Sequence, residues 1–189
     1  MTRSRPPRTL STSEERRETV LRTAVETFAA RGYYGTTTTE VATRAGISQA
    51  YVYRLFPNKE ALFLAVVEHA YDLVRDSLAR GAADATSTAP ADVLYAMGDS
   101  YARLIQDKNL LLIQLHAQAA AVAEPAVRDA VRAGYARVVE YVRSTSGASE
   151  PDVQQFFATG LLCHLIVAID ADHIDAPWAR ALSAGIRHF

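Results

Sequence analysis

Apolar residues recur every three or four positions along almost the whole chain, which is the period of amphipathic helices. No alternating apolar and polar run indicates a pair of strands. Breaks rich in Gly, Pro, Ser and Asp separate the periodic segments. The predicted helices cover about residues 13–31, two short stretches within 37–56, then 59–80, 91–106, 109–122, 125–144, 151–171 and 177–187. We therefore predict an all-α protein of about nine helices.

Residues 37–62 have the layout of a helix-turn-helix followed by the start of a third helix. Gly46 suits a left-handed turn between two short helices. Ser48 and Asn58 are good N-caps for the two helices that follow. Val52 supplies the buried side of the second helix. This segment predicts a DNA-binding unit that places one helix in a major groove.

The same segment resembles the DNA-binding domain of the TetR family of repressors, over about residues 13–70. The residues that carry the resemblance are Thr36-Thr37, Val41-Ala42, Ala45-Gly46-Ile47-Ser48, Val52-Tyr53, Phe56 and Asn58-Lys59-Glu60-Ala61-Leu62, with Phe28 to Tyr33 upstream. Thr38, Thr39, Tyr51 and Leu55 depart from the usual family residues. Because Thr39 and Tyr51 lie at base-reading positions, these departures affect the expected operator sequence and not the fold.

The resemblance divides the chain into three parts. Residues 1–12 are a flexible basic arm, 13–58 the helix-turn-helix domain, and 59–189 a helical effector-binding and dimerisation domain. Arg3, Arg5 and Arg8 of the arm either enter a minor groove or form a disordered leader.

Charge is distributed unevenly although the formal net charge is only −1. Residues 1–60 carry ten Lys/Arg against six Asp/Glu, and residues 61–189 carry ten against fifteen. A basic front and an acidic rear suit a protein whose N-terminal part meets phosphates.

Several polar side chains of the helix-turn-helix are predicted to contact double-stranded DNA. Gln49 can bind adenine, Tyr53 and Lys59 can bind phosphate, and Thr37 can cap its helix while presenting a hydroxyl to phosphate. Each also has a structural alternative as a solvated or packing residue. The full predicted set is Thr37, Thr38, Thr39, Arg44, Gln49, Ala50, Tyr51, Tyr53, Arg54 and Lys59.

For the body, the resemblance implies a small-molecule site and a homodimer that binds an inverted-repeat operator. The candidate ligand contacts are Tyr71, Tyr101, Gln114, His116, Gln118, Tyr135 and Phe157. Without a charged cluster among them, we expect a neutral or weakly polar effector. The candidate dimer interface is Phe156, Gly160, His164 and Val167, spaced along one helix face; ordinary core is the alternative.

Other function classes lack support in the sequence. Cys163 and His164 are adjacent on a helix and cannot form a catalytic dyad, so no enzyme is expected. We expect no cofactor and no metal, although Asp170, Asp172, His173 and Asp175 are crowded. A single cysteine and no long apolar span fit a cytoplasmic protein outside the membrane. Two interpretations remain: a repressor released by an effector, or a DNA-binding regulator controlled by a partner protein without any effector.

Overall fold

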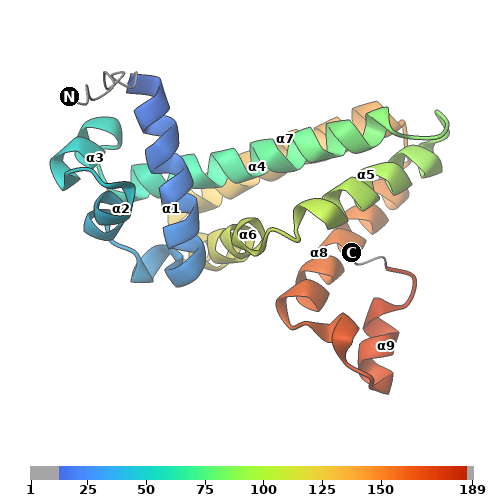
Figure 1. Ribbon diagram of the computed structural model, residues 1–189. Coiled ribbons are helices and arrows are strands. Elements are labelled where there is room, and N and C mark those ends of the chain that lie inside the picture. Colours follow the sequence, from blue (N-terminus) through green and yellow to red (C-terminus); the bar gives the residue numbers. More distant parts are fainter. Residues whose placement is uncertain (1–12, 187–189) are drawn as a thin grey trace, which may run out of the picture.

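The computed structural model describes residues 13–186, and this part of the chain forms nine α-helices and one 3₁₀ turn without a β-strand (Figure 1). The predicted all-α fold with an N-terminal helix-turn-helix is confirmed. The basic arm, residues 1–12, lies outside the described residues, as do residues 187–189.

The N-terminal head consists of α1 (Ser13–Gly35), α2 (Thr38–Ala45) and α3 (Gln49–Leu55). Its boundaries follow from local chemistry, as predicted. Ser48 accepts a hydrogen bond from the amide of Tyr51, and Thr37 caps α2 in the same way. Gly46 has φ 68°, a left-handed conformation that costs a side-chain-bearing residue energy. The turn between α2 and α3 is therefore fixed by glycine.

The long helix α4 (Lys59–Ala83) begins beside the head and runs through the body, alongside α7 (Figure 1). Asn58 caps its start through the amide of Ala61 at 2.7 Å. The other body helices are α5 (Pro90–Leu104), α6 (Lys108–Ala121), α7 (Pro125–Ser146), α8 (Glu150–Ala168), the 3₁₀ turn η1 (Ala171–His173) and α9 (Pro177–Ser183).

Buried apolar side chains form one continuous core from the head into the body. Phe28 of α1 packs against Phe63 of α4, with ring centroids 4.8 Å apart. Tyr33 contacts the same ring at 5.0 Å. The start of α4 therefore belongs to the core of the head as well as to the body.

Several helix ends differ from the predicted ones. The first helix was predicted to end at residue 31; Gly32 is non-helical there, with φ 68°, but helical turns continue to Gly35. The helix predicted for residues 59–80 continues to Ala83, and Gly81 lies inside it, where it allows close packing against α5. A Cβ at Gly81 would lie 2.5 Å from the carbonyl oxygen of Ala96 on α5. The last two helices end earlier than predicted, at Ala168 and Ser183. Among residues 13–186, no helix combines the length and the apolar character that crossing a bilayer requires.

Candidate DNA-binding surface and ligand cavity

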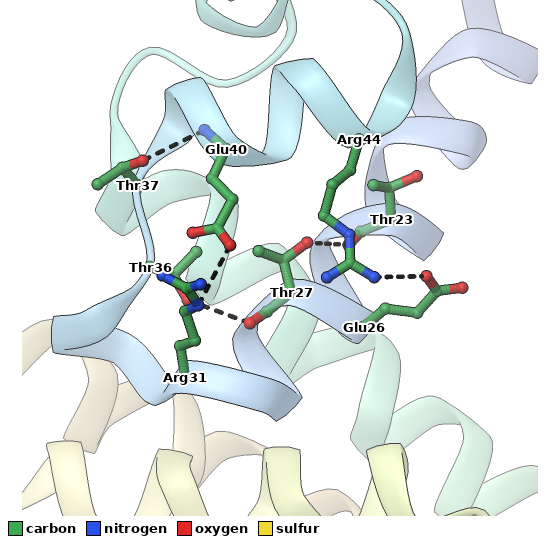
Figure 2. Close-up of polar contacts among 8 residues, drawn as sticks. All are labelled: Thr23, Glu26, Thr27, Arg31, Thr36, Thr37, Glu40 and Arg44. Atoms are coloured by element: carbon green, nitrogen blue, oxygen red, sulfur yellow. Dashed lines mark hydrogen bonds and ion pairs between the residues drawn. The ribbon is translucent and has the colours of Figure 1, made fainter.

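Polar contacts hold α2 against α1 (Figure 2). The Arg31 guanidinium lies 3.3 Å from the Glu40 carboxylate, and the Thr36 hydroxyl donates to the carbonyl of Thr27 at 3.2 Å. Arg44, one of the predicted DNA contacts, pairs with Glu26 of α1 at 3.4 Å. Its guanidinium therefore has a partner within the head.

On the other side of α2, the side chains of Thr38, Gln49 and Tyr53 bond to one another. The Gln49 amide donates to the hydroxyls of Thr38 at 3.1 Å and Tyr53 at 3.4 Å, and the Thr38 hydroxyl donates to Tyr53 at 3.1 Å. Thr38 is buried, whereas Gln49 and Tyr53 are exposed. The Gln49 and Tyr53 side chains are thus held in one orientation on the outer surface of α3.

Two guanidinium groups lie near the ring of Tyr51. Arg16 of α1 and Arg54 of α3 approach its ring centroid at 5.5 and 5.3 Å, within the range of cation–π attraction. Arg54 is exposed, as are the predicted contacts Thr39 and Ala50. Tyr51 and Arg54 thus place an aromatic and a cationic group near Gln49 on α3, the helix expected to enter the major groove.

Lys59, a predicted phosphate ligand, also has partners within the protein. Its Nζ donates to the carbonyl of Tyr33 at 3.0 Å and lies 4.6 Å from the Tyr33 ring centroid. That carbonyl belongs to the last turn of α1, where carbonyls lack helical partners. Lys59 therefore joins the end of α1 to the start of α4.

In the body, a groove of about 420 Å³ opens between α5 and α8. Its walls are mostly apolar and aromatic, with Leu94 and Tyr95 on α5 and Phe156 on α8. Small residues on both helices also line it: Gly98 and Ala102 on α5, and Gly160 on α8. A groove of this size falls within the range that small-molecule ligands occupy.

Behind the groove lies a smaller cavity of about 40 Å³ among α4, α5, α6, α7 and α8. Five of the seven predicted ligand residues line it: Tyr71, Tyr101, Gln114, Tyr135 and Phe157. Burial raises the pKa values of the Tyr71, Tyr101 and Tyr135 hydroxyls, so all three are neutral donors at pH 7.

The other two predicted ligand residues do not line either cavity. His116 follows Gln114 by two positions on α6 and so faces away from it. Its Nε2–H donates to the carbonyl of Ala29 on α1 at 3.2 Å. Gly32, at φ 68°, makes room for this ring, since a Cβ there would lie 2.9 Å from His116 Nδ1. Gln118 donates to the Tyr135 hydroxyl at 3.0 Å.

The four residues predicted for the dimer interface face the body of their own chain. Phe156 and Gly160 line both cavities, and Val167 packs against the cluster that contains Cys163. His164 is only 4% exposed and contacts the Tyr101 hydroxyl through Nε2. Burial lowers the pKa of His164 from 6.5 to about 4, so its imidazole is neutral at pH 7.

Sequence reasoning missed the outer groove, including Tyr95, Asp99 and Cys163. The available signal was the i, i+4 spacing of Gly98 and Ala102 on one helix, which leaves a shallow face. Sequence reasoning also treated Asp170, Asp172, His173 and Asp175 as one crowded group. The first three lie together at the surface, while Asp175 pairs with Arg180.

Comparisons with known proteins fit this arrangement. Residues 20–66 match the family of bacterial regulatory proteins, tetR family. The uncharacterized HTH-type regulator YuxN of Bacillus subtilis is 30% identical over 104 residues, 54% of this chain and 35% of YuxN. This chain spans roughly a third of the length of the curated relatives it matches.

Solved structures share the whole fold. A TetR-family regulator from Rhodococcus sp. superposes with a TM-score of 0.69 at 21% identity, covering 88% of this chain and 94% of that one. FadR from Bacillus subtilis, solved with stearoyl-CoA, gives 0.63 at 18% identity, covering 90% and 99%. The family match therefore assigns the helix-turn-helix segment, residues 20–66, to the tetR family of bacterial regulatory proteins, and the rest of the chain shares the fold of the solved regulators.

Proposed function

We propose that this protein is a dimeric transcriptional repressor that binds an inverted-repeat operator and is released by a neutral or weakly polar small-molecule effector. Proteins of its family are DNA-binding transcription factors without enzymatic activity. The observation that carries the proposal is the continuity of α4. This helix begins in the core of the head at Leu62 and Phe63 and lines the inner cavity with Tyr71, Val74 and Leu78.

The outer surface of α3 supports sequence reading. Gln49 offers an amide to a base edge, and Tyr53 and Arg54 offer a hydroxyl and a guanidinium to phosphates. Because Gln49 and Tyr53 already bond to each other through Thr38, less side-chain freedom is lost when DNA binds.

A second copy of the chain is needed because one head contacts too little DNA for specific binding, and inverted repeats are read by two-fold dimers. We assign the interface to the exposed apolar stripe of α8 and to α9. Leu161, Leu165 and Trp178 are 48%, 46% and 49% exposed, which is unusual for such large apolar side chains. Leu161 lies at the border between this stripe and the cavity-lining residues Phe156, Gly160 and His164, whereas Leu165 lines neither cavity.

The effector acts only if it prefers a conformer in which the two heads no longer fit the operator. The groove of about 420 Å³ supports this effector-controlled mechanism over control by a partner protein, which requires no cavity. FadR of Bacillus subtilis, solved with stearoyl-CoA, offers a precedent for ligand binding on this fold.

The test is selection of fragments of the source genome by the purified protein at one fixed, near-physiological salt concentration, followed by sequencing. We expect enrichment of an inverted repeat. Gln49→Ala should change which bases are preferred, whereas Arg54→Ala should weaken binding to all sequences and reduce the salt slope by about 1. Binding that is salt-sensitive but unselective would contradict the proposal and favour a partner-controlled regulator.

Lys59→Ala separates two roles of one side chain. If Lys59 binds phosphate, the variant loses DNA affinity and salt dependence while its unfolding midpoint changes little. If its bond to the Tyr33 carbonyl is its main role, the unfolding midpoint falls and the salt slope stays.

A further inference from the structure

The outer groove and the inner cavity adjoin and form one compartment in two parts. Tyr101, Phe156 and Gly160 line both. A Cβ at Gly160 would lie 3.9 Å from Tyr101 Cε1, an ordinary contact distance, so the junction has free space beside this glycine. A ligand that enters between α5 and α8 can therefore place one end against the side chains of the inner cavity.

The inner end offers a hydrogen-bond acceptor that nothing in the protein uses. The Tyr101 hydroxyl donates to Gln114 Oε1 at 3.1 Å, so its oxygen accepts from His164 Nε2–H. With the proton on Nε2, His164 Nδ1 carries a lone pair. This atom is buried without a partner, in a side chain that is 4% exposed. Leaving such a group unpaired is costly, which favours a ligand that donates to it.

Asp99 adds a second unused acceptor on the groove side. Its Oδ2 pairs with Arg103, and its buried Oδ1 has no hydrogen-bond partner. Asp152 also lines the groove, and it accepts a bond from the Ser149 hydroxyl at 2.5 Å. His164 Nδ1 and Asp99 Oδ1 therefore call for a donor on the ligand. The Tyr71 hydroxyl, a third buried group without a partner, also lines the inner cavity and can donate to a hydroxyl or amide oxygen of the same ligand.

The charge of the lining opposes ionic ligands. Among the described residues that line the groove and the inner cavity, the carboxylates Asp99 and Asp152 are present and no lysine or arginine is. An anion would lose its hydration without gaining a cation. A cation would find Asp99 already paired with Arg103, Asp152 exposed to water and bonded to the Ser149 hydroxyl, and no negative charge in the inner cavity.

We propose that the compartment binds an uncharged amphiphile: a hydroxyl or amide N–H head donates to His164 Nδ1, and an apolar body fills the groove between α5 and α8. This rests on the proposed function, in which the body binds a small-molecule effector. It excludes acyl-CoA thioesters and free fatty acids as effectors of this chain.

The experiment compares four probes with similar chains on the full-length protein without DNA: 1-octanol, heptyl methyl ether, octanoate and octylammonium. Cys163 is the only cysteine of the chain and lines the groove, 6% exposed. Its rate of alkylation by N-ethylmaleimide therefore reports occupancy, and the unfolding midpoint gives an independent measure of binding. We expect 1-octanol to slow alkylation and raise the midpoint. The ether, which has the same number of heavy atoms but no donor, should bind roughly two- to tenfold more weakly. Octanoate and octylammonium should bind more weakly still at pH 7.

Two variants locate the effect within the compartment. His164→Phe retains an aromatic ring but has no acceptor in place of Nδ1, so 1-octanol and the ether should bind equally. Gly160→Leu places a side chain at the junction and favours the helix, so it should abolish protection of Cys163 without lowering the unfolding midpoint.

The probe comparison on the unmodified protein decides the proposal even if a variant fails to fold. Equal binding of 1-octanol and the ether, stronger binding of either ion, or no binding of 1-octanol would each overturn it. Because no DNA is present, these results are independent of operator binding. A protein that selects no operator can still bind 1-octanol, and a specific DNA binder can still fail to do so.

Discussion

Replacing His164 should remove a large part of the pH dependence of stability. The unfolded chain takes up a proton at this imidazole near pH 6.5, whereas burial delays protonation of the folded protein to about pH 4. Between these values the unfolded state binds more protons, so the free energy of unfolding falls as the pH is lowered. Each pKa unit corresponds to 1.36 kcal/mol, which gives roughly 2 kcal/mol lost between pH 6.5 and pH 5, and roughly 3 kcal/mol by pH 4.

Urea unfolding at pH 7 and pH 5, at one fixed protein concentration, measures this contribution. The difference between the two pH values should be about 2 kcal/mol smaller in His164→Gln than in the unmodified protein. Other titrating groups act equally in both proteins and cancel in this comparison. Equal pH dependence in the unmodified protein and His164→Gln would refute the burial argument.

Three further outcomes can be measured by standard methods. Gly134→Ala should lower the free energy of unfolding by about 1–3 kcal/mol in a urea titration, because its Cβ would lie 2.3 Å from the Tyr71 ring. Asn58→Ala should cost about 1 kcal/mol in the same assay through loss of the α4 cap; an unchanged midpoint would show that the cap contributes nothing. Leu165→Asp should convert the dimer to a monomer in sedimentation velocity, whereas Gln154→Asp, an exposed polar change on the same helix, should leave it dimeric.

The head was predictable because its structure is encoded locally. Thr37, Ser48 and Asn58 cap helices through their own side chains, and Gly46 is required by one left-handed turn. Such signals depend on a few neighbouring residues, so they can be recognised in the sequence without knowledge of the fold. Gly81 shows the opposite case. A glycine near a small-residue loop predicts a helix end, but its actual role is set by the backbone of α5, which no local pattern reveals.

The cavity could be predicted only in part for the same reason. Tyr71, Gln114 and Tyr135 lie on three helices, and their aromatic or amide character marks them as candidates. The face of α6 that lines the cavity depends on how α6 crosses α1. In this crossing His116 contacts α1 and therefore does not line the cavity. The groove itself arises where small residues of α5 and α8 oppose each other, a match that requires the helix crossing to be known.

The seating of His116 at Gly32 has a consequence for engineered chimeras. Gln114 reaches the cavity and His116 reaches α1 from positions two residues apart on α6, so a shift of this stiff segment at the cavity displaces the imidazole as well. Gly32 accepts that imidazole because it has no side chain. Grafting this head onto the body of another regulator would transfer its operator specificity. The chimera would respond to the effector of the new body only if that body also placed a side chain against Gly32, as His116 does here.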